Sequence, residues 1–225
     1  MRIALFVPLH ITAIQDIYMA NMQSRFFYYA KKRLDIFSIM TIDEDQTNRF
    51  YDIADLRGTD ALIDLRKENN YGIVVPTLKA IEQVNNEFLP CDIFIRITQD
   101  TQITDFEKFE KTIQNLLRLD KFICGRKDTC SDIKNYLKEI EINQIGDSYS
   151  FVQGNMIMAS LSLWKDYYTK LPQSVKHYCD DSIFSYLCEH KGGIKPIFIE
   201  NDFWKENRTK DVYYLESLYK EENNA

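Results

Sequence analysis

The chain has 225 residues, enough to bury a full hydrophobic core as one large domain or two small ones. Its net charge of −6 and the lack of a Lys/Arg stripe argue against extended binding to nucleic acid, and its 45% hydrophobic residues are ordinary for a globular protein. No apolar run approaches the roughly 18 residues of a membrane span, and the N-terminal sequence MRIALFVPLH lacks the cleavage pattern of a signal peptide. The five cysteines contain no Cys-x-x-Cys pair, which favours reduced thiols in a cytoplasmic protein over a zinc site.

The N-terminal third predicts a strand, a helix and a second strand. An apolar run over Ile3–Pro8 indicates a buried strand, and apolar residues then recur every three or four positions over Ile11–Lys32, which predicts a helix that Thr12 can cap. Leu34–Ile42, rich in Ile and Phe, predicts the second strand, which stops at the acidic run Asp43–Asp45. This βαβ unit should cross over right-handed.

The central stretch is CDIFIRITQDT, residues 91–101. It follows a polar region with a minor strand over Ala61–Leu65 and a predicted helix over Thr77–Phe88. Its short continuous apolar run is typical of a strand buried on both faces of a parallel sheet. Ligands of open α/β sheets bind beyond the carboxyl ends of such strands, so we expect chemistry at the polar cluster Thr98–Thr101.

The second half of the chain predicts further strands and helices. Thr104–Leu119 has the clearest helical periodicity, and its first four residues fit a capping box that begins at Thr104. The other predicted elements are a strand over Lys121–Cys124, a helix over Ser131–Ile140, a strand over Tyr149–Ala159 interrupted at Gly154-Asn155, a helix over Leu161–Leu171 ended by Pro172, a helix opened by Asp180-Asp181, and a strand over Ile194–Glu200.

Three predicted strand ends carry groups that a nucleotide could use. These are His10 after the first strand, Asp43 with Asp45 after the second, and Asp100 after the central one. A parallel sheet brings such ends to one edge, where they offer a shelf for the base and carboxylates for hydroxyl or N–H groups. The alternative for each position taken by itself is an acidic residue that merely solvates a loop.

This layout resembles the GT-A glycosyltransferases, which use nucleotide-sugar donors. Val7-Pro8-Leu9-His10 matches the family's P-x-(H/N) element, Ile42–Asp45 its acidic cluster, and Asn70-Tyr71-Gly72 its Asn-x-Gly segment. The resemblance covers roughly residues 1–200 and rests on layout and short motifs. It implies a single α/β, Rossmann-like domain with a mainly parallel central sheet flanked by helices.

The family's division of labour then assigns residues 1–101 to a nucleotide-binding half, residues 102–200 to an acceptor half and residues 201–225 to a C-terminal tail. Trp204 follows the last predicted strand in a polar segment, which favours stacking on a sugar or closing over the donor. The implied donor site consists of Pro8, His10, Asp43, Asp45, Arg66, Asn70, Arg96, Thr98, Gln99, Asp100, Trp204 and Arg208.

The chain departs from the family at the Asp-x-Asp motif, which binds Mn²⁺ or Mg²⁺ and through it the donor diphosphate. Thr98-Gln99-Asp100 stands at that place, so only the last carboxylate is present and Asp100 is the implied metal ligand. Direct neutralisation of the diphosphate by cations is the alternative. The candidates for it are Arg96, Lys205, Arg208 and Lys210.

The acceptor side is implied by two further segments. Gln153, Gly154 and Asn155 lie in a strand that resembles the acceptor-lining strand of the family, and Asp180-Asp181 resembles the acidic pair that supplies the general base of inverting members. A helix dipole stabilises the carboxylate anion at this position, which lowers its basicity, and one of the two can instead be the N-cap. We favour Asp181 as the base.

The resulting expectation is an inverting glycosyltransferase that acts on a UDP-sugar and a glycan or lipid-linked acceptor in capsule or lipooligosaccharide biosynthesis. The protein would lie in the cytoplasm, with contact to the inner face of the membrane left open. Two alternatives remain: a non-catalytic nucleotide- or sugar-binding protein of the same fold, and a sugar-phosphate nucleotidyltransferase. The latter class usually has a Gly-rich basic loop after the first strand, which Pro8–Ile14 lacks.

Overall fold

The computed structural model describes residues 2–67, 72–130, 149–171, 180–200 and 203–206. Within these residues no helix is long and apolar enough to cross a bilayer. The elements are β1 (Arg2–Ile11), α1 (Ile14–Ala30), β2 (Asp35–Asp45), α2 (Phe50–Ile53), β3 (Ala61–Asp64), α3 (Val74–Glu87), β4 (Ile93–Ile97), β5 (Thr101–Ile103), α4 (Phe106–Leu116), β6 (Ile123–Cys130), β7 (Tyr149–Ser160), α6 (Leu161–Asp166), a 3₁₀ turn (Tyr168–Lys170), α7 (Asp180–His190), β8 (Ile197–Phe198) and β9 (Trp204–Glu206).

The core of the molecule is a seven-stranded sheet with the order β3-β2-β1-β4-β7-β6-β8. Pairing is parallel from β3 through β4, and among these seven strands β7 runs against the others. Every residue of β4 is buried, as expected for a central strand covered on both faces. The predicted mainly parallel α/β sheet is confirmed. The sheet combines strands from before and after residue 101, because β4 pairs with β7 from the second half of the chain.

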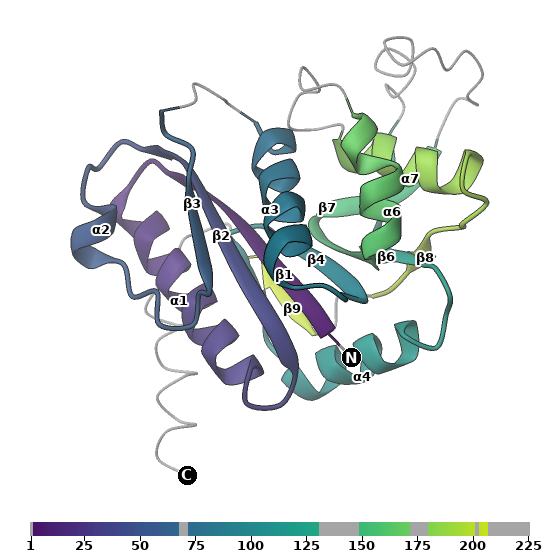
Figure 1. Ribbon diagram of the computed structural model, residues 1–225, viewed down its shortest axis with the longest axis horizontal. Coiled ribbons are helices and arrows are strands. Elements are labelled where there is room, and N and C mark those ends of the chain that lie inside the picture. Colours follow the sequence, from purple (N-terminus) through teal and green to yellow (C-terminus); the bar gives the residue numbers. More distant parts are fainter. Residues whose placement is uncertain (1, 68–71, 131–148, 172–179, 201–202, 207–225) are drawn as a thin grey trace.

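Helices cover both faces of this sheet (Figure 1). On one face, α3, α6 and α7 bury their apolar side chains against Phe94 of β4, whose ring lies 5.1 Å from that of Trp164. On the other face, α1 and α4 pack over Ile93 and Ile95. Neighbouring residues of a strand point to opposite faces, so a run such as Ile93–Ile97 supplies both cores at once.

The first strands are longer than the sequence predicts, and the first helix is shorter. β1 continues to Ile11 and β2 to Asp45, because the two strands stay paired past a bulge near His10. Helix α1 therefore begins at Ile14. The predicted cap at Thr12 is wrong: the Asp16 carboxylate accepts hydrogen bonds from the Thr12 N–H and the Ala13 N–H, both at 2.9 Å.

Downstream boundaries also differ from the prediction. The N-cap of α4 is Asp105, whose carboxylate accepts a hydrogen bond from the Lys108 N–H at 3.0 Å, so the capping box predicted at Thr104 is displaced by one residue. The helix predicted over Leu161–Leu171 is divided into α6 and the 3₁₀ turn. A two-stranded sheet of β5 and β9 was not predicted. The helix predicted over residues 131–140 lies outside the described residues.

Candidate functional site

Gln99 joins the carboxyl ends of β4 and β1. Its side-chain Oε1 accepts a hydrogen bond from the His10 N–H at 2.8 Å, and its Nε2 donates to the His10 carbonyl at 3.1 Å. The amide thus pairs with the backbone as a neighbouring strand would, just beyond the last residue of β4. Two of the predicted donor residues are therefore in direct contact although 89 positions separate them.

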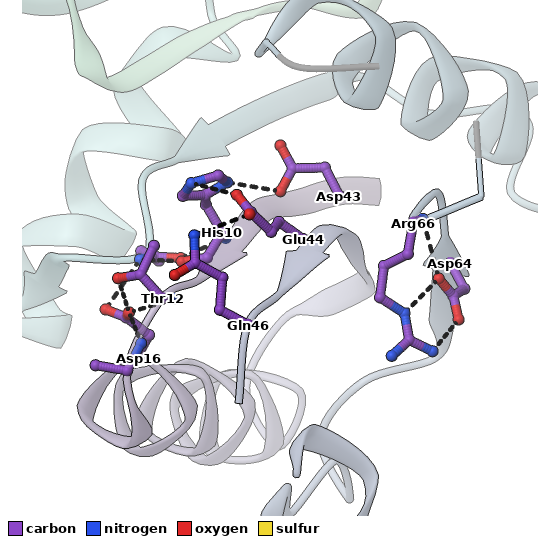
Figure 2. A network of polar contacts seen from close by, with 10 residues as sticks. His10, Thr12, Asp16, Asp43, Glu44, Gln46, Asp64 and Arg66 are labelled. Atoms are coloured by element: carbon purple, nitrogen blue, oxygen red, sulfur yellow. Dashed lines mark hydrogen bonds and ion pairs between the residues drawn. The ribbon is translucent and has the colours of Figure 1, made fainter. Parts of the chain in front are cut away.

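The His10 side chain meets the acidic end of β2 (Figure 2). Its Nδ1 lies 3.1 Å from an Asp43 carboxylate oxygen, and its Nε2 lies 3.0 Å from a Glu44 oxygen. The His10 side chain is 44% exposed and the Asp43 side chain 8%. One carboxylate therefore holds each ring nitrogen, and the open imidazole forms part of the sheet edge. The expected proximity of His10 and Asp43 is what the structure shows.

Asp45 and Arg66 are turned toward neighbouring segments of the chain. The Asp45 side chain is 1% exposed, and although burial raises its pKa, hydrogen bonds from Thr47 and the Phe50 N–H leave the pKa below its usual value. Arg66 forms an ion pair with Asp64 at 2.6 Å, shown in Figure 2, and this contact lowers the pKa of Asp64 to about 2. Both predicted donor contacts are thus engaged in the loops that follow β2 and β3.

Asp100 lies next to the end of β4 and close to β7. Its carboxylate accepts a hydrogen bond from the Thr98 hydroxyl at 2.6 Å, and the Thr98 N–H donates to the Asn155 carbonyl at 2.9 Å. In the part of the chain that the structure describes, no three His, Cys, Asp or Glu side chains are placed to hold a metal ion. The described side chains therefore do not build a metal centre by themselves.

Arg96 is not at the edge of the sheet. It is 1% exposed, and its guanidinium forms a buried ion pair with the Asp180 carboxylate. The Tyr168 hydroxyl accepts a hydrogen bond from Arg96 at 2.9 Å and donates to the same Asp180 oxygen at 2.7 Å. In this arrangement Arg96 binds α7 to β4, and its charge is already neutralised by Asp180. The expected contact with a diphosphate is not supported by this position.

Asp181 differs from its neighbour in having no cation bonded directly to it among the contacts of the described residues. Burial and the adjacent Asp180 charge raise the pKa of Asp181 to about 7. The Arg96 charge and N–H groups from Ser182 and Gly154 oppose this rise without cancelling it. The net shift is upward, opposite to the lowering that the helix N-terminus by itself would cause, and burial is its largest cause.

Gly154 allows the Asp181 carboxylate to approach β7. A Cβ atom at position 154 would lie 2.9 Å from an Asp181 oxygen, closer than real Cβ contacts. The glycine that interrupts the apolar run of β7 thus has a packing reason. The carboxylate of Asp181 thus lies against Gly154. The next residue of β7 is Asn155, whose carbonyl accepts the hydrogen bond from the Thr98 N–H. The base candidate, the acceptor-side segment and the end of β4 form one continuous row.

The other residues predicted to contact donor or acceptor range from buried to exposed. Trp204 is 3% exposed and packs on Phe203 with ring centroids 4.7 Å apart, so it does not present the open ring face that a sugar platform needs. Asn155 donates a hydrogen bond to Glu206 of β9. Pro8 lies in β1 opposite Thr41, Gln153 is half-buried, and Lys205 is exposed. Asn70, Arg208 and Lys210 lie outside the described residues.

Sequence reasoning missed Tyr168 and Glu206. Tyr168 completes the buried group of Arg96 and Asp180, and Glu206 links Asn155 to Arg126, whose Nη1 lies 3.4 Å from the Glu206 carboxylate. Neither residue carries a local signal, because each acts through partners more than ten positions away.

No protein-family model and no curated protein matches the sequence. Solved structures do match over most of the chain. The galactosyltransferase LgtC, in complex with donor and acceptor sugar analogues, covers 98% of this chain and 94% of its own, with 11% identity and a TM-score of 0.54. The fold is of the GT-A type.

Two other solved structures show how widely this fold is shared. The mannosyltransferase PcManGT from Pyrobaculum calidifontis, in complex with GDP-Man and Mn²⁺, has 10% identity and a TM-score of 0.57 over 88% of this chain, which spans 55% of that protein. The 4-diphosphocytidyl-2C-methyl-D-erythritol synthase from Anaerococcus prevotii has 14% identity and a TM-score of 0.54, and covers 97% of this chain and 98% of its own. The likeness is one of fold.

The buried ion pair gives a first prediction. Arg96→Met leaves the Asp180 carboxylate buried without its cation, so we expect the free energy of unfolding to fall by about 3–5 kcal/mol. Urea denaturation at pH 7 measures it. The double variant Arg96→Met, Asp180→Leu removes both charges and should regain most of the loss. A double variant no more stable than the single one would contradict this account.

The raised pKa of Asp181 gives a second prediction. Because the folded state binds this proton more tightly than the unfolded chain, Asp181 makes stability fall as pH rises from about 4 to about 7. Asp181→Asn removes this loss, so the variant should gain stability relative to the wild type by a few kcal/mol at pH 8 and little at pH 4. Thermal melts across this range measure the difference, and a gap independent of pH would disprove the raised pKa.

Proposed function

We propose that this protein is a glycosyltransferase that moves a sugar from a nucleotide-diphosphate sugar to a hydroxyl acceptor with inversion at the anomeric carbon. The observation that carries the proposal is the Asp181 carboxylate, which is 8% exposed, has a raised pKa and stands beside Gly154 in the row that begins at His10. A general base works best when its pKa is near the operating pH, and burial brings Asp181 to that range.

In this mechanism Asp181 takes the proton from the acceptor hydroxyl. The acceptor oxygen forms a bond to the anomeric carbon as the bond from that carbon to the diphosphate oxygen breaks, and the nucleoside diphosphate leaves with the electron pair. One displacement inverts the configuration. Asp180 takes no part in proton transfer, because its carboxylate is committed to Arg96 and Tyr168. Its charge instead helps to keep the pKa of Asp181 high.

The nucleotide is proposed to lie along the ends of β1, β2 and β4. His10 offers an imidazole face at this edge, and the Asp43 and Asp100 carboxylates offer hydrogen-bond acceptors to ribose or base groups. Gln99 holds β1 and β4 in register beneath them. We further propose a UDP-sugar as donor and a glycan or lipid-linked acceptor of capsule or lipooligosaccharide assembly, at the cytoplasmic side of the membrane; the family resemblance supports these finer assignments.

A divalent cation would fit beside the Asp100 carboxylate. Thr98 occupies one oxygen of the Asp100 carboxylate, and the other oxygen has no partner among the described residues. Mg²⁺ is commonly held by one or two carboxylates, with phosphate oxygens and waters completing the octahedron. Asp100 would therefore hold Mn²⁺ or Mg²⁺ together with the donor's diphosphate, and the ion would neutralise the leaving group. Protein side chains by themselves would not retain it.

Nucleotidyl transfer is the second candidate, because the synthase from Anaerococcus prevotii matches this chain over nearly the full length of both. The products separate the two reactions. A glycosyltransferase releases a nucleoside diphosphate from a nucleotide sugar, whereas a nucleotidyltransferase releases pyrophosphate from a nucleoside triphosphate and a sugar phosphate. A protein that binds nucleotides but releases neither product would be the non-catalytic alternative.

The base assignment gives a third prediction. In an assay of UDP release from UDP-sugars with Mn²⁺, Asp181→Asn should lower kcat about 10²- to 10⁴-fold and leave the KM for the donor nearly unchanged. Asp120→Asn removes an exposed carboxylate before β6 and serves as the matched control, with wild-type activity expected. Equal activity in Asp181→Asn and the wild type would show that another group takes the proton.

The contact between β1 and β4 gives a fourth prediction. Gln99→Ala removes both bonds to the His10 backbone, so UDP affinity measured by calorimetry should weaken about tenfold, as expected for the loss of 1–1.5 kcal/mol. Gln114→Ala, on the exposed side of α4, should bind UDP as the wild type does. If neither protein binds any nucleotide, the nucleotide-sugar assignment itself fails.

A further inference from the structure

A cavity lies beside the C-terminal end of α7, where residues of this helix, of β7 and of β8 line it. The cavity has a volume of about 320 Å³. Small-molecule sites usually measure about 300–1,000 Å³, so this cavity suits one ring-sized ligand rather than a chain. Its lining consists of Tyr149, Ser150, Glu189, His190, Lys195, Pro196 and Phe198.

This cavity is separate from the proposed transfer centre. Glu189 follows Asp181 by eight residues on α7, which at 1.5 Å per residue places it about 12 Å farther along the helix axis. Between them the seam is closed, because the Ser185 hydroxyl accepts a hydrogen bond from the Val152 N–H at 3.1 Å and both residues are fully buried. A ligand in the cavity therefore does not reach Asp181 through this seam.

The walls of the cavity carry the acidic Glu189, the basic Lys195 and the imidazole of His190. One Glu189 oxygen accepts a hydrogen bond from the Tyr149 hydroxyl at 3.0 Å, and the other has no partner among the described residues. Lys195 is exposed and likewise has no ion-pair partner in the described chain. The charges of Glu189 and Lys195 offset each other, which disfavours a phosphate, a diphosphate or a free cation bound to either of them. They favour an uncharged molecule that both donates and accepts hydrogen bonds.

An aromatic ring completes the chemistry. Phe198 is 39% exposed although it belongs to a strand of the main sheet, and the Lys127 Nζ lies 5.8 Å from its ring centroid, so the ring is partly accessible at the cavity with a cation on one face. His190, also in the lining, is held in place by stacking on Tyr186, with ring centroids 4.1 Å apart. Polar walls of this kind disfavour a lipid chain, whereas a pyranose ring has an apolar C–H face for Phe198 and hydroxyls for Glu189 and Lys195.

We propose that this cavity binds a single uncharged sugar ring of a glycan, independently of nucleotide and of the transfer centre. The lining is already formed, because the Tyr149–Glu189 hydrogen bond and the stacked His190 ring fix two of its walls, and such preorganisation reduces the entropy lost on binding. The site would anchor the protein on a glycan while Asp181 acts elsewhere.

The test is binding of the full chain to a printed array of neutral glycans in the absence of nucleotide, followed by titration of the best free glycan. The wild type should bind a subset of glycans, and Phe198→Leu, which keeps the apolar bulk but loses the flat ring, should bind at least tenfold more weakly. Tyr18→Leu is the matched control, because Tyr18 on α1 has a similar exposure of 41%. It should bind as the wild type does.

Other outcomes would overturn the proposal. The proposal fails if the wild type binds no glycan on the array. It also fails if Phe198→Leu binds the best glycan as tightly as the wild type does. Asp181→Asn should retain glycan binding, and its loss there would contradict the separation of the two sites. Because nucleotide is absent throughout, this result does not depend on the transfer reaction: UDP-sugar turnover can fail while glycan binding succeeds, and the reverse.

Discussion

A buried ion pair between Arg96 and Asp180 joins the centre of the sheet to α7, and the geometry of the candidate site depends on it. Removing two charges from water costs free energy, which their mutual attraction and further hydrogen bonds must offset. The Tyr168 hydroxyl contributes to this by bonding to both. The pair fixes the first turn of α7 against β4, and the residue that follows Asp180 is thereby held over Gly154.

The same pair explains why two adjacent carboxylates have different properties. Asp180 receives the cation, whereas Asp181 receives backbone N–H groups and lies within the field of its neighbour's negative charge. Desolvation then favours the protonated form of Asp181, as it does for carboxylic acids that act in catalysis at neutral pH. A single substitution at Gly154 would disturb this arrangement, since the glycine leaves the space that the carboxylate occupies.

The edge of the sheet depends on backbone pairing as much as on charge. Beyond the end of β4, the Gln99 side chain continues the hydrogen bonding between β1 and β4. The Thr98 N–H likewise continues the hydrogen bonding between β4 and β7. The proposed nucleotide side and the proposed acceptor side are therefore parts of one sheet. This continuity suits a reaction in which donor and acceptor must align, whichever of the reactions that use the GT-A fold takes place here.

The sequence by itself determined the α/β class, the buried central strand and the approach of His10 to Asp43, because uninterrupted apolar runs and the polar residues after them are local signals. It could not show that Arg96 turns inward to Asp180, that Trp204 is buried, or that Asp181 has a raised pKa. Those properties arise from contacts between residues far apart in the chain. Burial and charge pairing are set by what packs around a side chain, so only the tertiary structure decided them.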